Sequence, residues 1–76
     1  MTMRVIDLGI NKELFDEIYD LIVATMQHSN RFWYEVPFTK QNIITILWLA
    51  NMWNDRGYHA WIDGEVIIVE KWKEKA

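Results

Sequence analysis

The chain has 76 residues, a formal net charge of −3 and no cysteine, which excludes disulfides and thiolate metal sites. The negative charge argues against a protein held to DNA mainly by phosphate contacts, and no apolar run reaches the roughly 18 residues of a membrane span. We therefore expect one compact domain over residues 1–76, soluble and cytoplasmic, with neither nucleic acid nor a membrane as its partner.

Aromatic residues and self-association are the remaining sources of stability, because a chain of this size buries little surface on folding. Five positions hold tryptophan: Trp33, Trp48, Trp53, Trp61 and Trp72. These rings either supply missing core volume or form a binding surface, where Trp and Tyr are enriched.

The first expected elements are a short strand from Met3 to Leu8 and a helix from about Lys12 to His28. Gly9 ends the strand, and Asn11 suits the N-cap of the helix. One broad arc of this helix is apolar: Leu14, Phe15, Ile18, Tyr19, Leu21, Ile22, Thr25 and Met26. Acidic residues occupy the opposite side, which is typical of a solvated face or of a surface for a basic protein partner.

Residues 29–38 are interpreted as a connecting loop, because Pro37 disfavours helix at the preceding residue. The loop is rich in aromatic residues, with Phe32, Trp33 and Tyr34 beside Arg31. These rings either close over the core or contact a protein, and the combination of a guanidinium with stacking surfaces also suits a nucleotide.

A second helix is expected from about Lys40 to Arg56, with Thr39 as its cap and Gly57 after its end. Its main apolar arc holds Ile43, Ile46, Leu47, Ala50 and Trp53, and the opposite side holds Gln41, Thr45, Asn51, Asp55 and Arg56. Trp48, Leu49 and Met52 fall among the polar positions. A helix that is apolar nearly all round contacts more than one neighbour, so this surplus predicts an interface.

Residues 58–72 are predicted to form a β-hairpin around an Asp63-Gly64 type I′ turn, which pairs Trp61 with Val66 and His59 with Ile68. One face then carries Tyr58, Ala60, Ile62, Ile67 and Val69, and the other carries His59, Trp61, Val66, Ile68 and Trp72. Two apolar faces imply cover on both sides of the sheet.

These elements predict an α+β fold in the order β-α-α-β-β, with a three-stranded antiparallel-type sheet and two helices on one face. The first strand is compatible with either edge of the hairpin, and the pattern does not decide which sheet face meets the helices.

Catalytic and metal-binding patterns are missing from the sequence. His28 and His59 are the only histidines, no zinc motif or nucleophile elbow is present, and the glycines are scattered. We therefore expect no enzyme, no cofactor and no metal.

The function expected from these observations is stoichiometric binding of a larger protein, as an inhibitor or adaptor of the kind that bacteriophages encode, together with self-association, most simply as a dimer. The candidate contact residues are Arg31, Phe32, Trp33, Tyr34, Trp48, Met52, His59, Trp61 and Trp72. An alternative is a nucleotide or small-ligand site between subunits around residues 28–35. A winged-helix-like nucleic-acid binder is a third possibility, although the second helix has basic groups only at Lys40 and Arg56.

Overall fold

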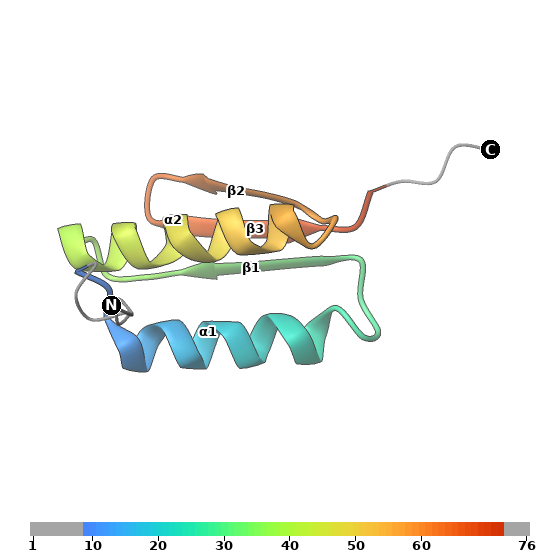
Figure 1. Cartoon of the computed structure of the whole chain (residues 1–76), viewed down its shortest axis with the longest axis horizontal. Coiled ribbons are helices and arrows are strands. Elements are labelled where there is room, and N and C mark those ends of the chain that lie inside the picture. The colour runs from blue at the N-terminus through green and yellow to red at the C-terminus, as the bar shows by residue number, and fades with distance from the viewer. Residues whose placement is uncertain (1–8, 73–76) are drawn as a thin grey trace, which may run out of the picture.

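The structure, a computed structural model, describes residues 9–72 as two layers, a three-stranded sheet and a pair of helices (Figure 1). The elements are α1 (Lys12–Thr25), β1 (Arg31–Glu35), α2 (Lys40–Asp55), β2 (His59–Asp63) and β3 (Val66–Glu70). The sheet is antiparallel with strand order β1-β3-β2, α2 packs on β2 and β3, and α1 packs on α2 and β1. The predicted α+β class, with a C-terminal hairpin and two helices on one face, is confirmed.

Both helices begin at the residues that the sequence predicts. The Asn11 side chain accepts a hydrogen bond from the Leu14 amide, and the Thr39 hydroxyl accepts one from the Asn42 amide. Each cap satisfies an amide that has no partner inside its helix. The ends lie slightly earlier than expected, at Thr25 and Asp55, and Gly57 follows α2 with a φ of 91°.

The third strand of the sheet is not the one that the sequence analysis expected. Residues 31–35, which we interpreted as loop, form β1 and pair with β3, whereas the strand predicted at Met3 to Leu8 lies outside the described residues. Arg-Phe-Trp-Tyr-Glu alternates in burial, because Phe32 points into the core while its neighbours Arg31 and Trp33 are exposed. Pairing with β3 therefore decides the conformation of a segment whose three consecutive aromatics hide the two-residue period.

The hairpin forms with a register shifted by two residues from the prediction. Trp61 pairs with Ile68 instead of Val66, and His59 pairs with Glu70 instead of Ile68. The two loop residues are Gly64 and Glu65, and Gly64 has a φ of 61°, which is the type II′ pattern with glycine first. Because side chains alternate with a period of two, this shift leaves every residue on its predicted face.

The core lies between the helices and the face of the sheet that carries Phe32, Ile67 and Val69. Ile18 and Ile22 enter it from α1, and α2 contributes most of the rest with Ile46, Leu49, Ala50 and Trp53. Leu21, predicted on the apolar arc of α1, is instead exposed. The sequence analysis is also wrong about α2, because Leu49 is fully buried while Leu47 is 45% exposed.

Two buried polar residues explain the orientation of α2 about its own helix axis. Thr45, predicted on the polar side, is fully buried, and its hydroxyl donates to the Gln41 carbonyl at 2.7 Å and accepts from the Asn11 amide at 2.9 Å. Asn42 is buried too and donates to the Pro37 carbonyl at 2.9 Å. Since these groups are hydrogen-bonded, α2 presents them to α1 at little desolvation cost.

Candidate interaction surface

The sheet has an outer face, directed away from the helices, that is formed by every second residue of each strand. Its side chains come from β1 (Arg31, Trp33, Glu35), β2 (His59, Trp61, Asp63) and β3 (Val66, Ile68, Glu70). None of them belongs to the buried core cluster beneath the helices. Antiparallel sheets with one covered face usually present polar residues to water on the other, so the apolar centre of this outer face is unusual.

Strand register arranges these nine side chains in three rows that cross the sheet. We call them the Arg31 row (Arg31, Glu70, His59), the Trp33 row (Trp33, Ile68, Trp61) and the Glu35 row (Glu35, Val66, Asp63). The Trp33 row lies in the middle. Trp33 is 63% exposed, whereas Ile68 between the two tryptophans retains only 6% exposure. The sheet therefore carries an apolar stripe across its centre, with charged groups on both sides.

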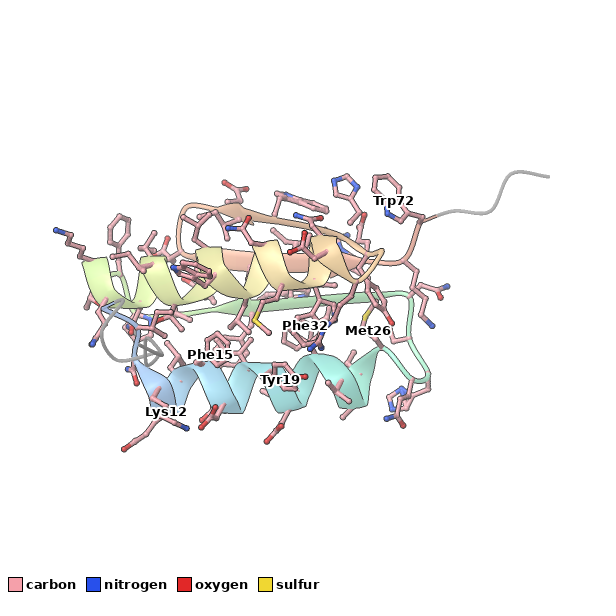
Figure 2. The ribbon with its side chains drawn as sticks, viewed as in Figure 1. Lys12, Phe15, Tyr19, Met26, Phe32 and Trp72 are labelled. Atoms are coloured by element: carbon pink, nitrogen blue, oxygen red, sulfur yellow. The ribbon has the colours of Figure 1, made fainter. Side chains whose placement is uncertain are left out.

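An aromatic cluster extends the outer face beyond the end of β3. The His59 ring lies 4.6 Å from the Trp61 ring and 4.6 Å from the Trp72 ring, and it stacks on Trp72 with an interplanar angle of 20°. Trp72 is 63% exposed and lies at the C-terminal end of the described residues (Figure 2). Stacking on His59 holds this exposed indole against the sheet.

The charges on the outer face are separated along the strands. In the Arg31 row, the Nε atom of Arg31 lies 3.1 Å from an Oε atom of Glu70. In the Glu35 row, the carboxylates of Glu35 and Asp63 flank Val66. No salt bridge involves Glu35 or Asp63 within residues 9–72. One end of the face is therefore acidic, whereas the other end carries the ion pair of Arg31 with Glu70 and the imidazole of His59.

The residues that the sequence analysis grouped around the aromatic segment are divided between the two faces of β1. Arg31 and Trp33 lie on the outer face, but Phe32 is buried beside Met26 in the core (Figure 2). Tyr34 faces the helices, and its hydroxyl donates to a carboxylate oxygen of Glu17 at 2.7 Å. The strand thus separates Arg31 from two of its three aromatic neighbours.

The contact with Glu17 gives Tyr34 the one clear pKa shift within residues 9–72. The hydrogen bond to the Glu17 carboxylate raises the pKa of the Tyr34 phenol, and partial burial and the negative charge of Glu17 raise it further. These causes disfavour the phenolate. Tyr34 therefore ties β1 to α1 as a neutral donor and is not a candidate for a nucleophile or base at ordinary pH.

A second apolar surface lies on α2, on the side that faces away from the sheet. Leu47 and Trp48 are adjacent there, 45% and 42% exposed. Met52, which we predicted beside Trp48, is half-buried and packs against the core. We call Leu47 and Trp48 the α2 patch. It belongs to the opposite layer from the outer face, so the two apolar surfaces lie on opposite sides of the molecule.

Five residues of the outer face were missing from the sequence-based candidates: Glu35, Asp63, Val66, Ile68 and Glu70. The predicted hairpin face included Val66 and Ile68, whereas Asp63 was predicted only as a turn residue. Alternating burial places Arg31, Trp33 and Glu35 on one side of β1, but three consecutive aromatic residues conceal this alternation in the sequence. The cross-strand rows required the register of β1 against β3.

Comparison of the chain with protein-family models, with curated proteins and with solved structures found no match. Across residues 9–72, no helix is long and apolar enough to cross a membrane. That part of the chain also lacks a group of three His, Asp or Glu side chains placed to hold a metal ion. The geometry of the two surfaces therefore carries the functional argument.

Proposed function

We propose that the chain is a non-catalytic binding protein, an adaptor or stoichiometric inhibitor, that contacts a larger protein and also associates with itself. The observation that carries this proposal is the presence of large exposed apolar side chains on both layers, Trp33 and Trp72 on the sheet and Trp48 on α2. Contiguous exposed apolar patches rimmed by polar residues mark interaction sites, and Trp is enriched where binding energy concentrates.

The two surfaces divide these roles. The outer face has charged groups at both ends of an apolar stripe, which suits self-association, and the α2 patch is left for the larger protein. An inhibitor or adaptor of the phage accessory kind acts by contact alone, so no catalytic group is required.

Native mass spectrometry of the tagged chain, purified gently from its own cells, tests this division. We expect a dimer that retains a further protein mass. Trp48→Ala should remove the added mass and keep the dimer, whereas Trp33→Ala should weaken the dimer. A wild-type spectrum that holds only the bare monomer would contradict the proposal.

The nucleotide or small-ligand site around residues 28–35 stays a prediction with less support. Its guanidinium is paired with Glu70, and Phe32 and Tyr34 point to the other side of the strand from Trp33. Arg31→Ala combined with calorimetric titration of ATP checks this alternative, which requires binding in the wild type and its loss in the variant.

A further inference from the structure

We infer that the occupant of the outer face is a second copy of this chain, related by a two-fold axis that runs along the Trp33 row. This inference rests on the proposed function and specifies how the chain associates with itself. Two sheets that pack face to face keep their strand directions within about 30° of each other, and a two-fold interface brings the same patch of both copies together.

The apolar stripe is complementary to itself under this axis. A half-turn about the Trp33 row places each residue of the row opposite its own counterpart: Trp33 on Trp33, Ile68 on Ile68 and Trp61 on Trp61. Trp33, which is exposed in a single copy, and Trp61, which is half-buried there, are then covered. Interface cores are apolar and rich in Trp, so this row has the composition of such a core.

The charged rows favour this two-fold axis over a two-fold axis that runs along the strands. The same half-turn exchanges the two ends of each strand, so that Arg31 faces Glu35 of the second copy and His59 faces Asp63 of the second copy. A two-fold axis along the strands would instead place Arg31 opposite His59 and Glu35 opposite Asp63. The second arrangement sets the carboxylate of Glu35 against that of Asp63, and juxtaposed like charges suppress association, whereas the first sets the Arg31 guanidinium against a carboxylate.

The proposed contacts are within reach despite sheet twist. Rotating one sheet by about 30° displaces a group two residues from the axis by about 3–4 Å. The long Arg31 side chain is 59% exposed, so it can follow that displacement while its Nε atom stays beside Glu70 of its own chain. The acidic groups of Glu35 and Asp63 have no competing salt bridge within the described residues.

The size of the face predicts a reversible dimer. Three strands of five residues cover about 14 Å by 17 Å at ordinary strand spacing. This footprint of about 240 Å² is well below the roughly 800 Å² that each partner buries in a standard specific interface. We therefore expect a weak, reversible dimer whose fraction rises with protein concentration.

Sedimentation velocity of the purified chain across a concentration series tests the inference with charge reversals. Arg31→Glu and Glu35→Arg should each weaken the dimer at least about tenfold, because each reversal acts at two symmetry-related contacts. An equimolar mixture of the two variants should restore it, since the glutamate introduced in one chain then meets the arginine introduced in the other. Rescue by mixing requires a contact between copies and cannot result from a repaired fold.

Lys40→Glu is the matched control. It makes the same change in net charge as Arg31→Glu, but it lies on α2 and should leave the dissociation constant unchanged. Thermal unfolding followed by circular dichroism shows whether each variant is folded. Should Arg31→Glu not fold, His59→Glu with Asp63→Arg repeats the design on β2.

Three results would overturn the inference: a wild type that stays monomeric at every concentration, single reversals that dimerise as the wild type does, or a mixture no stronger than its components. A monomeric chain that still retains a larger protein through Trp48 would refute this inference and the self-association part of the proposed function, but not its partner part. If mixing the reversed variants restores the dimer but the chain purified from cells retains no other protein, only the partner part of the proposed function is refuted.

Discussion

At the scale of single residues, helical periodicity located α2 but did not orient it. Leu47 and Leu49 are two positions apart and equally apolar, so the pattern offered two nearly equivalent faces. Thr45 decides between them, because its hydroxyl forms hydrogen bonds with Gln41 and with Asn11 of the other helix. Partners so distant in sequence are invisible to a local pattern, which counts Thr45 as polar and therefore exposed.

Leu49→Ala and Leu47→Ala measure this orientation directly. Truncation of the fully buried Leu49 should lower the free energy of unfolding by about 2–5 kcal/mol. The same change at the exposed Leu47 should stay within about 0.5 kcal/mol. Urea denaturation of both variants at one protein concentration compares them, and a larger loss for Leu47→Ala than for Leu49→Ala would show that α2 is turned as the sequence analysis predicted.

Tyr34 makes a prediction about alkaline pH. Because its pKa in the folded chain lies above the usual value of about 10, folding favours the protonated phenol. The stability that Tyr34 contributes is therefore fully present below the unfolded pKa and is lost as pH rises through the higher folded pKa. Absorbance of phenolate should show a late-titrating tyrosine that Tyr34→Phe removes and Glu17→Ala shifts back toward the ordinary value. A late titration that survives in Tyr34→Phe would contradict the assignment.

At the scale of elements, the sequence was sufficient for the helices and the hairpin but not for β1. Caps at Asn11 and Thr39 and the glycine turn at residue 64 are local signals, and all three were recognisable. The hairpin register was not, since Asp63-Gly64 and Gly64-Glu65 are both plausible turns and only packing distinguishes them. The three consecutive aromatic residues of β1 were interpreted as part of a loop, because the pairing of this segment with β3 cannot be inferred from its local sequence.

One side chain of α2 forms hydrogen bonds with the backbone at the edge of β2. Asn54 donates to the Ala60 carbonyl at 2.8 Å and accepts from the Ala60 amide at 2.8 Å, which pairs both backbone groups of an edge residue. Asn54→Ala should therefore cost about 1–3 kcal/mol. The control is Asn51→Ala, since Asn51 is exposed on the same helix and forms no side-chain hydrogen bond in residues 9–72. If calorimetric unfolding shows the same loss of stability in both variants, Asn54 does not stabilise the edge of β2.

At the scale of the whole molecule, the two layers bury one face of each element against the other and leave an apolar surface on each outer side. The sequence analysis named all four tryptophans of these surfaces, and it correctly separated the two faces of the hairpin. It could not assemble the outer face, because the three rows bring together residues nearly forty positions apart. The arrangement of an apolar row between two rows with charged residues exists only once the three strands are paired in the sheet.

Hydroxyl-radical footprinting of the purified chain, read by mass spectrometry at low and at high protein concentration, tests the central claim that the outer face is a contact between copies. Trp33 on the sheet and Trp48 on α2 are both exposed in the single chain, so each reports on its own layer. We predict that oxidation of Trp33 falls as concentration rises while oxidation of Trp48 stays constant. Protection of Trp48 with unchanged oxidation of Trp33 would contradict the account.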